Sequence, residues 1–142
     1  MPQSRKHQHL YLTSGYSVAR ETVPRIEPSI GFQTLGVYLT PSSSQLHQAK
    51  VLREISDRYY NSISSVPLSP DKAFLSYTMF LRPKLTYPLP CSTLSEVQCR
   101  QIQAPALVGL LPELKLNRHT PRAVLCGGFQ LGGLQIPELY TD

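Results

Sequence analysis

The spacing of apolar and polar positions changes at about residue 41 of the chain. Before it, apolar residues form short runs at 10–13 and 35–39 that are rich in β-favouring side chains. After it, apolar residues recur at steps of three or four, as on one face of a helix. The pattern predicts an α+β fold, a small N-terminal antiparallel hairpin or sheet followed by a mainly helical bundle of four helices. We expect a disordered tail at 1–9, the β segment at 10–41, the helical region at 42–126 and an extended, truncated tail at 127–142.

The stretch 31–40, GFQTLGVYLT, predicts a single strand. Pro41 ends it, because proline cannot donate to a sheet ladder. Gly36 lies inside this strand, which indicates a bulge or a close approach by a backbone or ligand, with the bulge favoured. Residues 16–30 carry Pro24 and Pro28 and predict a loop with one edge strand.

The first helix is predicted to start at Ser42, which forms a capping-box spacing with Gln45. Its polar face offers opposite charges four residues apart, which favours a solvated, self-paired surface. These pairs are Lys50–Glu54, Arg53–Asp57 and Glu54–Arg58, and the apolar face carries Ala49, Leu52, Ile55, Tyr59 and Ile63.

Three further helices are predicted from caps and prolines. The second is capped by Ser69, begins at Pro70 and ends at Arg82-Pro83, with Phe74, Tyr77 and Leu81 facing inward. The third starts near Ser92 or Thr93 with a Thr93–Glu96 capping box, turns Leu94, Val97, Cys99 and Ile102 inward, is kinked or broken at Pro105 and ends at Pro112. The last has Thr120 as its cap and Pro121 as its first residue.

Composition points to one domain of 142 residues with short elements, since 13 prolines each fix φ and remove a donor. The net charge of +5 is compatible with a polyanionic partner, although a solvated, mildly basic surface explains it as well. Three cysteines without a CxxC spacing favour reduced thiols and an intracellular location, nuclear or cytoplasmic. No apolar run is long enough to span a membrane.

Catalytic motifs are not visible. The three aspartates, Asp57, Asp71 and Asp142, are far apart, whereas a two-metal site needs carboxylates that share ions about 4 Å apart. A nucleophile pair of Cys126 with His119, or a zinc site that adds Cys99, lacks diagnostic spacing. We therefore expect no catalytic residues, no bound metal and no cofactor in this chain.

The densest basic cluster is Lys115, Arg118, His119 and Arg122, at the start of the last helix. The amide donors of a helix N-terminus favour a phosphate at such a place. The alternative is that these charges pair with Glu113 or Glu138. The sequence alone does not decide between the two.

Several segments together carry a resemblance to a known family. GFQTLGVYLTPSSSQ, LSPDKAFLSYTMFLRPKLTYPLP, QCRQIQAPAL and LNRHTPRAVL follow one another over roughly residues 10–142. In these segments the chain resembles the region after the catalytic palm in retrotransposon-type reverse transcriptases. Those enzymes are the RNA-directed DNA polymerases of transposable elements. The resemblance implies a hairpin that grips the primer end and a helical thumb, at 42–126, that holds the template–primer duplex.

By the same resemblance Leu35, Gly36 and Val37 are primer-grip residues. The aspartates that hold divalent metal in the family, Mg²⁺ in our expectation, lie upstream of this region, so the chain is expected to be a non-catalytic fragment that lacks the polymerase fingers and palm. We expect weak, non-specific binding of nucleic acid through phosphates. The candidate contacts, in order, are Lys115, Arg118 and Arg122, then Arg82 and Lys84, then Lys50 and Arg53.

Two other functions stay open at this stage. One is a host-retained protein-interaction module that uses its helical faces and has no nucleic-acid role. The other is a thiol enzyme with Cys126 as its nucleophile.

Overall fold

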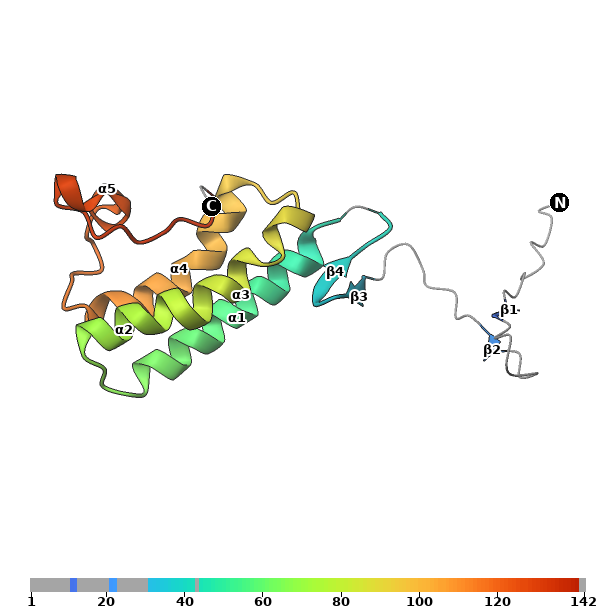
Figure 1. The fold of residues 1–142 in the computed structure, drawn as a ribbon, viewed down its shortest axis with the longest axis horizontal. Coiled ribbons are helices and arrows are strands. Elements are labelled where there is room, and N and C mark those ends of the chain that lie inside the picture. Colours follow the sequence, from blue (N-terminus) through green and yellow to red (C-terminus); the bar gives the residue numbers. More distant parts are fainter. Residues whose placement is uncertain (1–10, 13–20, 23–30, 43, 141–142) are drawn as a thin grey trace.

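The computed structural model describes residues 11–12, 21–22, 31–42 and 44–140 (Figure 1). Two short strands, β1 (Tyr11–Leu12) and β2 (Glu21–Thr22), pair antiparallel with Tyr11 opposite Thr22. They fall within the two N-terminal segments for which strands were predicted. The tail expected at 1–9 lies outside the described residues.

The stretch 31–40 is a hairpin, so the prediction of one strand with a bulge at Gly36 is wrong. Strands β3 (Phe32–Thr34) and β4 (Val37–Leu39) pair antiparallel, with Thr34 opposite Val37. Leu35 and Gly36 form the turn between them, with φ of 50° and 84°. Two central residues with positive φ are the mark of the type I′ turn, whose twist suits a tight hairpin.

Helices follow the hairpin and confirm the α+β fold (Figure 1). Helix α1 (Leu46–Ser64) lies along α4 (Glu96–Glu113), and α2 (Pro70–Ser76) also contacts α4. Helix α2 continues without a break through a π-helical turn η1 (Tyr77–Leu81) into α3 (Arg82–Thr86). A 3₁₀ turn η2 (Leu89–Cys91), the short α5 (Arg122–Cys126) and a second 3₁₀ turn η3 (Phe129–Leu131) complete the described elements.

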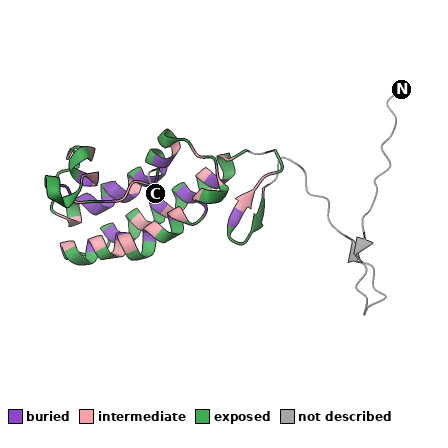
Figure 2. Ribbon diagram, turned by 45° about the horizontal axis from the view of Figure 1, so that its top comes forward, coloured by how far each residue is buried: buried purple, intermediate pink, exposed green. Residues whose placement is uncertain are grey.

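The core lies between α1, the continuous α2–η1–α3 helix and α4, where buried residues face one another (Figure 2). Leu52 and Ile63 come from α1, Tyr77 and Leu81 from η1, and the predicted inward faces of these helices are confirmed. Helix α4 contributes Cys99 and Ile102 as predicted, but Val97 is 64% exposed, so its predicted inward position is wrong.

Helix α2 has Ser69 as its N-cap and Pro70 as its first residue, as predicted, although the Ser69 side chain makes no cap bond. The other helix starts differ from the predicted caps. Helix α1 begins at Leu46 after Gln45, whose side chain makes no cap bond, so the Ser42–Gln45 capping box is wrong. Helix α4 is capped by Ser95, whose hydroxyl accepts the amide of Gln98 at 3.3 Å while the Gln98 side chain accepts the amide of Ser95 at 2.9 Å. The predicted Thr93–Glu96 box is therefore displaced by two residues. Pro121, not Thr120, is the N-cap of α5.

Prolines do not end the helices where they were predicted to. Pro83 lies inside the continuous helix, directly after the π turn in which the amide of Arg82 donates to the carbonyl of Tyr77. Pro83 has no amide hydrogen to donate. It lies where the helical hydrogen-bond pattern is already irregular because of the π turn, so its missing donor disturbs the helix little. Pro105 does not break α4, and α4 ends at Glu113, one residue after the end predicted at Pro112.

The segment after α5 folds back on the bundle. Its backbone amides bond to α5, from Leu134 to the Val124 carbonyl at 2.9 Å and from Ile136 to the Leu125 carbonyl at 2.8 Å. Ile136 and Leu139 are buried in the common core. Residues 127–140 therefore pack against the bundle, although most of them have no regular secondary structure.

Candidate nucleic-acid interface

The tip of the β3–β4 hairpin presents the three residues suggested as a primer grip. Leu35 is 85% exposed and Gly36 is exposed, whereas Val37 is buried on the side of the hairpin that faces the helices. The tip therefore offers one apolar side chain and the backbone of a tight turn. Val37, at 5% exposed, is not available to a ligand.

Two hydrogen bonds fasten the hairpin to the helical bundle. The Tyr87 hydroxyl, at the end of α3, donates to the Leu35 carbonyl at 3.0 Å. The Tyr38 amide donates to Oε1 of Gln48, a buried side chain of α1, at 2.8 Å. Leucine rarely adopts positive φ. The Tyr87 bond holds that strained residue, and with it the whole turn, at a fixed place beside the bundle.

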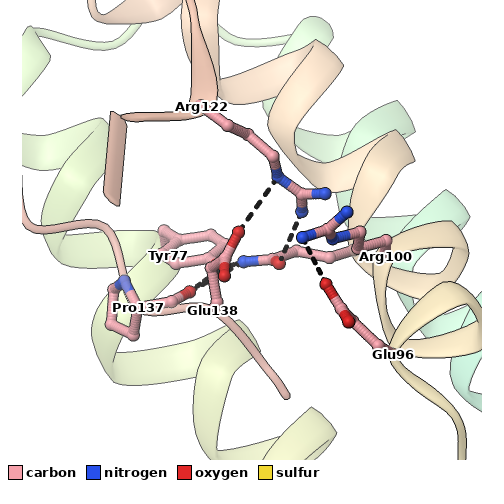
Figure 3. Close-up of polar contacts among 7 residues, drawn as sticks. Tyr77, Glu96, Arg100, Arg122, Pro137 and Glu138 are labelled. Carbon is pink, nitrogen blue, oxygen red and sulfur yellow. Dashed lines mark hydrogen bonds and ion pairs between the residues drawn. The ribbon is translucent and has the colours of Figure 1, made fainter. Parts of the chain in front are cut away.

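The basic cluster around α5 is divided by the structure. Lys115 and Arg118 are exposed in the connection between α4 and α5. Arg122 is partly buried, pairs through Nε with a Glu138 carboxylate oxygen at 3.2 Å and donates to the Gln103 side chain at 3.4 Å (Figure 3). The pairing with Glu138 considered from the sequence is thus present for Arg122. Lys115, Arg118 and His119 are the members of the cluster that are exposed to solvent.

Figure 3 shows the polar network that holds the Arg122 side chain. Gln103 is buried and donates to the Tyr77 hydroxyl at 2.6 Å and to the Pro137 carbonyl at 2.8 Å. Its carbonyl oxygen then receives the Arg122 guanidinium. This network ties η1, α4, α5 and the C-terminal segment together. Removing Arg122 would open it, so Arg122 is a structural residue before it is a phosphate contact.

Of the two candidates on α1, Lys50 is exposed and Arg53 bridges two helices. Arg53 Nη1 donates to the Gln101 carbonyl of α4 at 2.6 Å. In a regular helix this carbonyl would accept the amide of the residue four positions later, which here is Pro105 and has none. Arg53 also lies 3.7 Å from Asp57, one of the predicted ion pairs. Its guanidinium is therefore committed within the fold.

On α3, the two candidates differ in exposure. Arg82 is partly buried and has a partner within the protein. Lys84 is exposed and lies on the wall of a groove that it shares with Arg58 and Phe80. Arg58 and Phe80 were not among the sequence candidates. Arg58 was assigned to a pair with Glu54, and Phe80 lies in the π turn, whose extra residue no helical periodicity reveals.

Thiol and metal chemistry gain no support. Burial, followed by the neighbouring Glu138 carboxylate, raises the pKa of Cys126, and burial also raises that of Cys99. A raised pKa disfavours the thiolate that a nucleophile or metal ligand needs. The described part of the chain contains no group of three His, Cys, Asp or Glu residues that could hold a metal ion.

No family model, no curated protein and no solved structure matches the chain significantly. Among the described helices none is long and apolar enough to cross a membrane.

Proposed function

We propose that this chain is the primer-grip and thumb segment of a retrotransposon-type reverse transcriptase, a non-catalytic fragment that holds a template–primer duplex through its phosphates. The observation that carries the proposal is the fastened hairpin. A tight turn with an exposed tip stands at the side of a helical bundle and is bonded to it by Tyr87. That is the arrangement that the sequence resemblance implies for a grip beside a thumb.

Charge adds a second support. Arg53 is exposed but is engaged by Gln101 and Asp57. The other exposed candidates are Lys50, Lys84, Lys115 and Arg118, and they come from α1, α3 and the α4–α5 connection. Cations on several elements suit a backbone that runs across a surface. Binding of this kind is sequence-independent and weak, with Kd of about 10⁻⁴ to 10⁻⁶ M at physiological salt.

Salt dependence tests the proposal directly. The double variant Lys115→Ala/Arg118→Ala should flatten the slope of log affinity against log salt for a blunt DNA duplex by up to about two units, since each phosphate contact contributes about 0.9. Titrations by fluorescence anisotropy start at low salt. Lys72→Ala/Arg100→Ala removes the same charge from α2 and from the Arg100–Glu96 pair on α4, and it should change the slope less.

Arg122 is kept in both variants, because its loss would disturb the Gln103 network as well as remove a charge. Equal slopes for the two double variants would show that Lys115 and Arg118 do not contact the phosphates of the duplex. If the unmodified chain binds no duplex even at low salt, the duplex-holding function is wrong.

A protein-interaction module is the second candidate, and one surface favours it. An apolar groove of about 530 Å³ lies where the start of α2 meets the end of α4 and the η3 turn. Phe74, Leu75, Leu114, Leu116, Phe129 and Leu134 line it. Exposed apolar surface of this kind is typical of contact with another protein. A chain that binds no duplex would leave this function as the better one.

A further inference from the structure

A second groove, of about 400 Å³, runs between α1 and the continuous helix of η1 and α3. Its floor is apolar, with Ile55 of α1 and the buried Leu81 of η1. Arg58 stands on the α1 wall and Lys84 on the opposite wall. The volume lies within the range of small-ligand sites, which is about 300–1,000 Å³.

The two cations of this groove are available to an anion. Within the described part of the chain neither Arg58 nor Lys84 makes an ion pair, whereas Arg53, Arg100 and Arg122 each have a carboxylate partner. The other polar groups at the groove are already used. The Tyr59 hydroxyl shares a hydrogen bond with Ser76 at 2.8 Å, and the Ser62 hydroxyl donates to the Arg58 carbonyl at 2.9 Å.

An aromatic ring completes the set of contacts. Phe80 lines the same groove and is 67% exposed, whereas Tyr77 and Leu81 of the same π turn are buried and Met79, also exposed, does not line the groove. An exposed ring beside two unpaired cations matches a ligand that has a flat apolar part and a negative charge. In single-stranded nucleic acid each unpaired base offers a face for stacking and each phosphate a charge.

We propose that this groove binds one nucleotide unit of single-stranded nucleic acid, with its base stacked on Phe80 and its phosphate between Arg58 and Lys84. A duplex does not fit this description, because its bases are already stacked on one another and do not offer their faces. The inference deepens the proposed function, on which it rests for the class of ligand. It adds a site for an unpaired strand that is separate from the duplex contacts at Lys115 and Arg118.

Binding of a short fluorescent oligo(dT) to the full chain tests the site. Phe80→Ala should weaken binding at least fivefold, because stacking of one base on an aromatic side chain contributes about 1–3 kcal/mol. Met79→Ala is the matched control, since Met79 is 65% exposed in the same π turn but does not line this groove, and it should leave the affinity unchanged. Circular dichroism confirms that each variant stays folded.

The cations are tested by the salt dependence of the same binding. Arg58→Gln and Lys84→Gln should each reduce the slope of log affinity against log salt by about 0.7, the value for single strands. Lys72→Gln, on the exposed surface of α2, should leave this slope unchanged.

An abasic oligonucleotide separates stacking from charge, and a blunt duplex separates this inference from the proposed function. The abasic strand should bind more weakly than oligo(dT) and should show no loss with Phe80→Ala. If oligo(dT) and the abasic strand bind equally, or if Met79→Ala weakens binding as much as Phe80→Ala, the nucleotide site is wrong. Duplex binding that depends on Lys115 and Arg118 would still uphold the proposed function in that case.

Discussion

Gly109 lies where α4 comes closest to α1. A Cβ atom at this position would lie 2.9 Å from Ile63 Cγ2 and 2.9 Å from Tyr60 Cδ2, closer than carbon atoms pack. Ile63 is buried and cannot move without disturbing the core. The absence of a side chain at 109 therefore sets the distance between the two longest helices.

Gly109→Ala should lower the free energy of unfolding by about 1 kcal/mol in chemical denaturation. Overpacking costs about 1–3 kcal/mol, and the better helix propensity of alanine offsets up to about 1 kcal/mol of it. Gly128→Ala is the control, because a Cβ there meets no atom within 4 Å. A Gly109→Ala protein as stable as the unmodified chain would show that the helices can move apart freely.

Tyr77 makes stability depend on pH in the alkaline range. Burial raises the pKa of its hydroxyl to about 12, partly opposed by the hydrogen bond from Gln103. The unfolded chain loses this proton near pH 10, so between pH 10 and 12 it binds fewer protons than the folded chain, and stability falls as pH rises.

Tyr77→Phe should remove most of this dependence, which is on the order of 2 kcal/mol across the window. The variant is expected to be about 1 kcal/mol less stable at pH 7, because it loses the hydrogen bond to Gln103. Denaturation at pH 8 and at pH 11 measures both effects. An unchanged difference between the two pH values would assign the alkaline loss to other groups, such as Tyr59, whose pKa burial also raises.

At the scale of elements, Arg53 supplies the hydrogen-bond donor that the Gln101 carbonyl of α4 lacks because Pro105 has no amide hydrogen. Its guanidinium donates to the Gln101 carbonyl from the neighbouring helix. Arg53→Ala should therefore lower the free energy of unfolding by about 1–3 kcal/mol, the usual effect of losing a hydrogen bond from a charged group. Lys50→Ala, an exposed cation three residues earlier in α1, should change stability little. Equal effects would mean that solvent satisfies the Gln101 carbonyl as well as Arg53 does.

The cap of α4 offers a direct comparison between two serines. Ser95→Ala should cost about 1 kcal/mol, because it removes the acceptor for the Gln98 amide. Ser42→Ala should be close to neutral, since α1 begins four residues later and has no side-chain cap bond. Thermal denaturation of both variants distinguishes them. A larger effect at Ser42 would restore the capping box that the sequence indicated.

Sequence patterns predicted the fold class, most of the helix faces and the start of α2 at Pro70, but not the other helix ends. The faces of α1 and of the second helix follow from local periodicity, which Leu52, Ile63, Tyr77 and Leu81 obey. The ends depend on contacts that are distant in sequence. Pro105 is tolerated in α4 because Arg53 lies beside it, and the turn at Leu35 is held by Tyr87. Neither partner can be identified from local spacing.

At the scale of the whole molecule, the candidate site also combines features that follow from local sequence with features that depend on contacts distant in sequence. Exposure agrees with expectation for Lys50, Lys84, Lys115 and Arg118, because each lies on the polar side of its segment. Arg53 donates to a backbone carbonyl of another helix, which a count of charges cannot reveal, whereas the Arg122–Glu138 pair was one of the alternatives that the sequence left open. Arg58 and Phe80 meet across two helices, so they could be associated only once the packing of those helices was known.

The C-terminal segment decides how large the cooperative unit is. Ile136 is 1% exposed in the core formed with α4 and η1, whereas Leu131, in the same segment, is 90% exposed. If residues 127–140 fold together with the bundle, Ile136→Ala leaves a cavity that costs about 2–5 kcal/mol of the free energy of unfolding. Leu131→Ala should stay within about 0.5 kcal/mol of the unmodified chain. Chemical denaturation followed by far-ultraviolet circular dichroism measures both. If Ile136→Ala lowers the free energy of unfolding by less than about 1 kcal/mol, the helical bundle is stable without the packing of residues 127–140.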